Sequence, residues 1–113
     1  MNKLVNRVVL IGNLGADPEM RDFGKDKRVV NLRMATNEYY KDANGDKQER
    51  TTWHRVVAWN NQARFLADAC KKGSRLLVEG KLENKRWEKD GEPRYSTEIR
   101  LNEFMLLDDR KKN

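Results

Sequence analysis

The three tryptophans of this chain, Trp53, Trp59 and Trp87, alternate with basic residues in segments that resemble β-strands. Arg55 is separated from Trp53 and from Trp59 by an even number of positions, and Lys85 and other charged residues are separated from Trp87 in the same way. Residues at such spacing share one face of a strand. On strands, these rings would lie on the polar face of a sheet. Aromatic rings stack on unpaired bases of any sequence, at about 1–3 kcal/mol per base. Rings spaced along one surface with arginine between them are therefore typical of a platform for single-stranded nucleic acid.

Two of these rings have an alternative placement. Trp87 is close to a predicted hairpin tip, where a twist or bulge would reverse the parity and pack the indole under a neighbour. Trp59 ends its segment, where a large side chain can close a barrel as part of the core. Tyr39 and Tyr40 end an earlier segment, and alternation places Tyr39 on the polar face. Parity thus favours stacking by Trp53, Trp87 and Tyr39, and leaves Trp59 open.

Basic side chains near the rings would supply the phosphate contacts that a single-stranded polyanion requires. The candidates are Arg55, Lys85 and Arg86 beside the tryptophans, Arg33 on the polar face of an earlier strand, and Lys3 and Arg7 near the N-terminus. Any one of them alone is typical of a solvated surface charge, so the prediction depends on the set.

Side chains suited to catalysis are scarce. Nucleophilic catalysis needs a base oriented beside the nucleophile, and His54 and Cys70 are the single histidine and cysteine. The sequence has no glycine-rich phosphate loop and no paired metal-ligand motif. Asp17 and Glu19 lie in a predicted turn, where solvated carboxylates are the rule. We therefore expect no enzymatic activity, no metal and no other cofactor, and we interpret His54 as structural.

Five segments have the composition and alternation of β-strands, and one has that of a helix. The strands cover about residues 4–11, 28–40, 48–59, 76–88 and 94–107. Residues 17–26 are predicted to form a loop, and an Asn-Gly pair at 44–45 predicts a hairpin. Apolar residues at helical spacing predict a short helix over residues 60–72, which Gly73 ends. Five strands with one helix between the third and fourth are typical of an all-β OB-fold, a small Greek-key barrel.

Composition agrees with one small, basic domain. A chain of 113 residues has room for a single modest core, which excludes a two-domain enzyme. Its net charge of +6 is typical of polyanion binders but also of ordinary soluble domains. Charged residues make up 37% of the chain, so folding is expected to depend partly on oligomerisation. The single cysteine, the lack of a long apolar run and the lack of a signal-peptide pattern predict a cytoplasmic, nucleoid-associated protein.

Five stretches of the chain resemble the bacterial single-stranded DNA-binding protein family, in family order and at family spacing. They are VNRVVLIGNLGADPE at 5–19, MATNE at 34–38, TWHRVV at 52–57, KGS at 72–74 and VEGKL at 78–82. Five co-linear segments are far more specific than any one motif. The resemblance implies an OB-fold domain over residues 1–107, followed by a short charged end at 108–113. It also implies sequence-independent binding of single-stranded DNA in replication, recombination and repair.

The resemblance implies further that the chain forms a homotetramer with the DNA wrapped around its outside. It places stacking residues at Tyr40, Trp53, Trp59 and Trp87, so both Tyr39 and Tyr40 stay candidates, and a bulge near the hairpin would reconcile them. His54 matches a family histidine near a subunit contact. Val5 and Asn6 belong to an apolar yet basic first strand, which we predict to be a pairing edge between subunits.

One departure from the family concerns the C-terminal end. Family members usually continue into a flexible tail with a short acidic tip that recruits replication and repair proteins. This sequence ends in DDRKKN, which is basic and follows no linker. We therefore do not carry over recruitment of partners through such a tail.

Two other binding functions are compatible with the same pattern. One is an OB-fold subunit of a primosome or replication-restart complex that uses this surface for protein partners, although the three tryptophans argue against it. The other is RNA binding, because nothing in the sequence reads the 2′-hydroxyl.

Overall fold

A computed structural model of the chain describes residues 3–107, with the side chain of Lys3 excepted. The predicted charged end at 108–113 therefore lies outside the described residues. The elements are a 3-10 helix η1 (Lys3–Asn6), β1 (Val8–Leu14), β2 (Glu19–Asp22), β3 (Arg28–Lys41), β4 (Lys47–Trp59), α1 (Asn60–Ala69), β5 (Arg75–Lys89) and β6 (Glu92–Leu106).

Five of the six strands close into a barrel. β1 pairs with β5, β5 with β6, β6 with β4, and β4 with β3. The ring closes where β3 pairs with the end of β1, through Asn13↔Ala35 and Leu14↔Met34. The β4–β6 contact is parallel and the others are antiparallel. This order, with α1 between the third and fourth barrel strands, confirms the predicted all-β OB-fold.

The core fills the barrel with inward-facing residues from all five barrel strands. Leu32, Met34, Val56, Leu76 and Val78 are fully buried or nearly so. α1 covers one end of the barrel and contributes Ala63 and Leu66 to the same core. At Gly12 the strands approach so closely that a β-carbon would overlap the carbonyl of Ala35, which explains the glycine.

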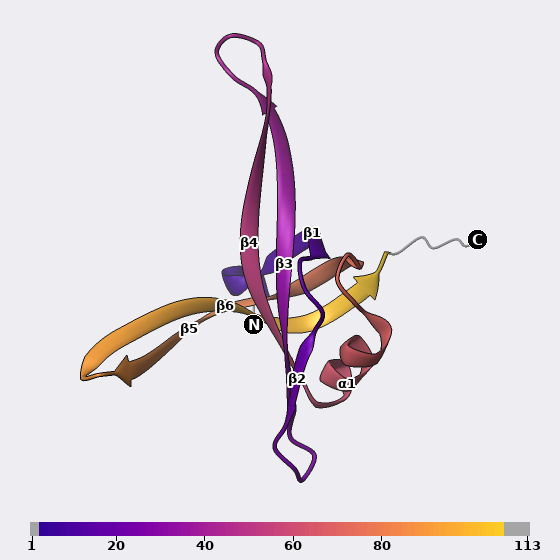
Figure 1. The fold of residues 1–113 in the computed structure, drawn as a ribbon, viewed down its shortest axis with the longest axis vertical. Helices are drawn as coiled ribbons and strands as arrows, with labels where there is room; N and C mark the ends of the chain where they lie inside the picture. The colour runs from indigo at the N-terminus through magenta and orange to yellow at the C-terminus, as the bar shows by residue number, and fades with distance from the viewer. Residues whose placement is uncertain (1–2, 108–113) are drawn as a thin grey trace.

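Three hairpins extend beyond the barrel (Figure 1). The long β3–β4 hairpin has an unbroken register from Val29↔Trp59 to Lys41↔Lys47. The β5–β6 hairpin has one irregularity, where Glu79 pairs with Glu103 but Gly80 pairs with Leu101, so Asn102 is the additional residue. The turn between β2 and β3 projects at the opposite end from the β3–β4 tip. Among residues 3–107, no helix is long and apolar enough to span a membrane.

The structure differs from the predicted elements at two places near the N-terminus. The first strand was expected at about 4–11, but it begins at Val8 and continues to Leu14. Residues 3–6 form η1 instead. The side chain of Asn6, at the end of η1, bonds to both the N–H and the C=O of Leu82. Residues 17–26 were predicted to be a loop, yet they include β2, whose four residues pair with Arg28–Asn31 of β3.

Candidate nucleic-acid interface

The outer face of the β3–β4 hairpin carries two of the tryptophans. Residues directly opposite each other share a face, and the register pairs Ala35 with Trp53, Arg33 with Arg55 and Val29 with Trp59. The parity that predicted Trp53, Arg55 and Trp59 on one surface therefore holds in the structure.

Trp53 is half-exposed and is held from two sides. The residue keeps 50% of its accessible surface, and the guanidinium carbon of Arg33 lies 5.0 Å from its ring centroid. The ring also lies against Gly15, where an added β-carbon would come within 2.6 Å of the Cη2 atom. Because Gly15 has no side chain, the indole can rest directly on the loop that follows β1.

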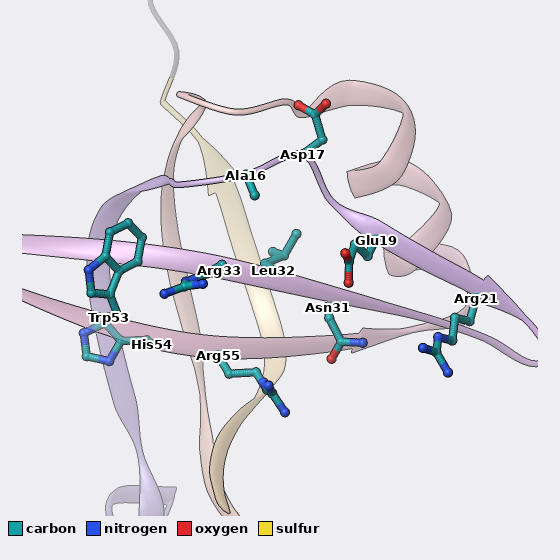
Figure 2. Close-up of a pocket in the computed structure, with 10 residues that line it drawn as sticks. All are labelled: Ala16, Asp17, Glu19, Arg21, Asn31, Leu32, Arg33, Trp53, His54 and Arg55. Atoms are coloured by element: carbon teal, nitrogen blue, oxygen red, sulfur yellow. The ribbon is translucent and has the colours of Figure 1, made fainter.

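A cavity of about 680 Å³ extends from Trp53 along β3 and β4. Figure 2 shows Trp53 at one end and Arg21 at the other, with Arg33, Asn31 and Arg55 between them. The loop after β1 and the start of β2 add two carboxylates to its rim, Asp17 and Glu19. Cations thus line the floor of this cavity, and acidic residues stand at one side.

Trp59 lines a second cavity, of about 290 Å³, and Arg21 and Asn31 line both cavities. Its ring is flanked by two cations: the Nζ of Lys27 is 5.9 Å and the guanidinium carbon of Arg100 is 5.4 Å from the ring centroid. Trp59 is only partly buried and is not one of the barrel's core residues. The alternative placement of Trp59 as a core plug is therefore wrong.

Trp87 and Lys85 lie on the outer face of the β5–β6 hairpin, opposite Arg94 and Ser96. Trp87 is 46% exposed. The alternation of faces along β5 is not reversed before Trp87, because the additional residue, Asn102, is on β6 and lies far from the hairpin tip. Lys85 lines the same cavity as Trp59, which connects this hairpin to the β3–β4 surface.

Glu98 joins the two hairpins. Its carboxylate lies 3.6 Å from Nη1 of Arg55 on β4 and 4.0 Å from Nζ of Lys85 on β5. The Glu98 side chain is only 11% exposed, so it contacts these cations from beneath. A second carboxylate, Glu83, lies 3.7 Å from Nη1 of Arg100. The cations of this surface are therefore partly neutralised and held in place by the protein itself.

Tyr39 and Tyr40 lie on opposite faces of the β3–β4 hairpin. The unbroken register puts Tyr39, opposite Glu49, on the face of Trp53, and puts Tyr40, opposite Gln48, on the other. The bulge that would have reconciled alternation with the family resemblance is not there. Both tyrosines are exposed, and the guanidinium carbon of Arg50 lies 5.3 Å from the Tyr40 ring.

Two of the predicted phosphate contacts are not brought to this surface. Arg7 forms an ion pair of 2.6 Å with Glu79 and lines a separate cavity beside β1. Arg86 has the opposite parity to Trp87, and its Nε donates a 3.4 Å hydrogen bond to the hydroxyl of Tyr95. Arg33, in contrast, is at the centre of the site. The side chain of Lys3 lies outside the described part of the chain.

The residues predicted for the oligomer interface have three different environments. His54 is half-buried, with its Nε2 3.0 Å from Oγ1 of Thr36, and burial lowers the pKa of its imidazole. Val5 is exposed on η1, whereas Asn6 is held by the Leu82 backbone. Residues 3–107 contain no cluster of three or more histidines, cysteines or carboxylates placed to hold a metal ion.

Four further side chains of this surface were not predicted from the sequence: Arg21, Phe23, Lys27 and Arg100. The first three belong to the segment from β2 to β3. The only sequence signal for them was the mixture of basic and aromatic residues in that segment, which also suits an ordinary loop.

An OB-fold barrel whose outer strands present half-exposed tryptophans between cations is typical of proteins that bind single-stranded nucleic acids. Comparison with known proteins assigns the chain within that class. Residues 5–107 match the single-strand binding protein family, and the chain belongs to that family.

Individual relatives agree in sequence and in fold. Single-stranded DNA-binding protein 1 of Chlorobaculum tepidum is 42% identical over 109 residues, which cover 95% of this chain and 67% of the relative. The Plasmodium falciparum SSB, solved in complex with ssDNA, superposes with a TM-score of 0.83 at 31% identity, over 96% of this chain and all of that one. The wild-type single-stranded DNA binding protein from Thermus aquaticus gives a TM-score of 0.78 at 35% identity, over 93% of this chain. This chain spans only 51% of the Thermus protein.

Proposed function

We propose that this protein binds single-stranded DNA without sequence preference and catalyses no reaction. The observation that carries the proposal is one outer surface on which Trp53, Trp59 and Trp87 alternate with cations. Bases would stack on the three indoles, and phosphates would contact Arg33, Arg55 and Lys85. The family membership supports the same activity, with the roles in DNA replication, recombination and repair that follow from it.

The chemistry of the surface suits a ligand without fixed sequence. Each stacked base contributes about 1–3 kcal/mol whatever its identity, and cations contact phosphates that every nucleotide carries. Duplex DNA hides its bases in the stack and cannot use the indoles. The surface should therefore prefer unpaired strands. Such strands occur at the nucleoid, and we propose a cytoplasmic, nucleoid-associated location on that ground.

Tyr39 and Tyr40 extend the proposed path differently from the indoles. Tyr39 shares the Trp53 face, so a strand leaving Trp53 toward the hairpin tip would meet it first. Tyr40 would be reached by a strand that crosses to the other face, where Arg50 already lies against its ring. We leave Arg7 and Arg86 out of the proposed path, because each bonds to a partner away from the indoles.

We also propose that the chain acts as a homotetramer that wraps the DNA. β1 pairs with β5 over Val8–Asn13, but with β3 only at Asn13 and Leu14. Within residues 3–107, most of β1 thus has no strand partner along one edge. Val9 and Ile11 are exposed on its outer face, and Met105 of β6 is exposed beside Leu77. An open edge next to exposed apolar side chains is well suited to pairing with a second copy.

The proposal is tested by binding of fluorescein-labelled oligo(dT) to wild type and to a W53A/W59A/W87A triple variant, with the Y95A variant as control. Tyr95 is an exposed aromatic residue on the opposite face of the β5–β6 hairpin. We expect the triple variant to lose most of its affinity and Y95A to bind as wild type. Equal binding by all three proteins would contradict stacking on this surface. A matched oligo(rU) titration separates DNA from RNA binding, and light scattering after gel filtration measures the oligomer.

A further inference from the structure

Phe23 is an exposed aromatic residue at the base of the turn between β2 and β3. The residue is 59% exposed, although a phenylalanine side chain has no polar group to gain from contact with water. The turn projects from the barrel at the end where β4 finishes (Figure 1), and the last residue of β4 is Trp59. Phe23 is neither a core residue nor one of the hydrophobic residues packed against the core.

The turn that carries Phe23 is built to a fixed shape. Oδ1 of Asp22 accepts a 2.8 Å hydrogen bond from the N–H of Gly24, and Oδ2 accepts one of 3.3 Å from Nε of Arg28. The hydrogen bond from Gly24 lowers the pKa of the Asp22 carboxyl. Phe23 and Lys27 close the turn through a backbone bond of 2.8 Å from the N–H of Phe23. The exposed ring is therefore presented by an ordered hairpin.

Phe23 is continuous with the surface around Trp59. The two rings flank one ammonium group, since Nζ of Lys27 is 5.8 Å from the Phe23 centroid and 5.9 Å from the Trp59 centroid. Both rings line the same cavity, together with Arg21 and Lys85. The alternation of ring and cation along Trp53, Arg55 and Trp59 thus continues through Lys27 to Phe23.

We propose that Phe23 is a further base-stacking residue, which binds a nucleotide beyond Trp59 while Lys27 contacts the intervening phosphate. This inference rests on the proposed binding of single-stranded DNA and extends the path onto the β2–β3 turn. It makes the turn the end of the binding surface in each protomer. The number of nucleotides that one protomer contacts should therefore include one that depends on Phe23.

The test compares Phe23→Ala with Phe65→Ala, a matched loss of an exposed phenylalanine outside the surface. Phe65 is on α1 and lies against Phe104, 5.5 Å between ring centroids. Affinity for oligo(dT) of increasing length is measured for both variants and for the Phe23→Tyr variant. We expect Phe23→Ala to weaken binding of the longest oligomers by at least about fivefold, the lower limit for loss of one base stack. Phe65→Ala should bind as wild type, and Phe23→Tyr should restore most of the affinity.

The length series adds a second readout. With Phe23→Ala, affinity should stop increasing at a shorter oligomer than with wild type. A Phe23→Trp variant provides a third readout in the W53A/W59A/W87A background. There the new indole is the only tryptophan of the chain, and its fluorescence should be quenched by oligo(dT) added at saturating concentration.

Two failures are distinguishable. If wild type does not bind oligo(dT), or if Trp53→Ala binds as tightly as wild type, the proposed function itself is wrong. If wild type binds and Trp53→Ala is weakened, but Phe23→Ala matches Phe65→Ala in affinity and in length dependence, then Phe23 lies off the path and the inference is overturned. Circular dichroism of each variant checks that the barrel is intact, and a loss of fold in Phe23→Ala would contradict a side chain that only serves a ligand.

Discussion

Replacing Gly15 with alanine should weaken DNA binding through Trp53 alone. The added β-carbon would lie 2.6 Å from Cη2 of the Trp53 ring, well inside van der Waals contact. Gly15 does not have the positive φ that several other glycines of the chain have, so alanine is tolerated by the backbone. The ring is rigid and must therefore shift by about 1 Å to regain an ordinary contact of about 3.5–4.0 Å. Such a shift takes it off its position against Arg33.

The cost follows from the contacts that the ring makes. A cation–π contact at an exposed site is worth about 0.5–1 kcal/mol, and a stacked base about 1–3 kcal/mol. We expect Gly15→Ala to weaken oligo(dT) binding by about 1–3 kcal/mol, or about 5- to 150-fold. The loss should not exceed that of Trp53→Ala, because the indole is the only ligand-facing group that the new methyl displaces.

A double-mutant cycle makes this reasoning refutable. In the Trp53→Ala background, where the clash is gone, Gly15→Ala should change the binding free energy by less than about 0.5 kcal/mol. Affinities for oligo(dT) are measured for wild type, both single variants and the double variant at one salt concentration. Additive losses would refute the account, since Gly15 would then act through something other than the ring. Urea unfolding of each variant checks that the barrel keeps its stability.

Three further predictions concern charge and protonation. Glu98→Gln should tighten oligo(dT) binding by about threefold, which is the effect of removing one charge about 7 Å from a phosphate in water. Glu88→Gln, the same change near the hairpin tip, serves as control. Weaker binding by Glu98→Gln would mean that Glu98 matters more for positioning its cations than for neutralising them. Lys85→Ala should reduce the salt dependence of binding, whereas Arg86→Ala should leave it as in wild type, and equal effects would contradict the assignment of the two residues to opposite faces. Burial lowers the pKa of the His54 imidazole below 6.5 in the folded protein. The unfolded chain therefore binds more protons than the folded protein near that pH, and the free energy of unfolding should fall as the pH decreases from 7 to 5.5. His54→Gln should flatten that slope in urea titrations, and an unchanged slope would assign it to other groups.

Alternation along uninterrupted strands predicted much of the binding surface. β4 and β5 run for 13 and 15 residues, so a parity set by their buried residues also holds at Trp53 and Trp87. The barrel topology followed from the order of strands and helix. The family resemblance predicted the same topology, which the pattern of one strand alone does not determine.

Two features depend on contacts between residues far apart in the chain. Arg7 was predicted to face phosphate, but Glu79, 72 positions later, forms an ion pair with it. Leu82 has the parity of the barrel core and yet is exposed, because the β5–β6 hairpin leaves the barrel after Gly80. Tertiary geometry, not strand pattern, decides both positions.

The segment around β2 was the least predictable part of the site. Its four residues are all exposed, so no alternation of buried and exposed residues marks them as a strand. Pairing with β3 orders them, and that pairing brings Arg21 and the Phe23 turn beside Trp59. A short exposed strand of this kind is recognised only once its partner is known.

The most direct test of the central claim is a titration with oligo(dT) that follows tryptophan fluorescence at two salt concentrations, with duplex DNA as control. Stacking on the three indoles predicts strong quenching by oligo(dT) and little by the duplex. Phosphate contacts from Arg33, Arg55 and Lys85 predict a log–log salt slope of about −2 per protomer bound, at about −0.7 per contact on a single strand, and the proposed Lys27 contact would add about −0.7 more. Unchanged fluorescence with no binding, or equal quenching by duplex DNA, would contradict the claim that this surface holds unpaired bases.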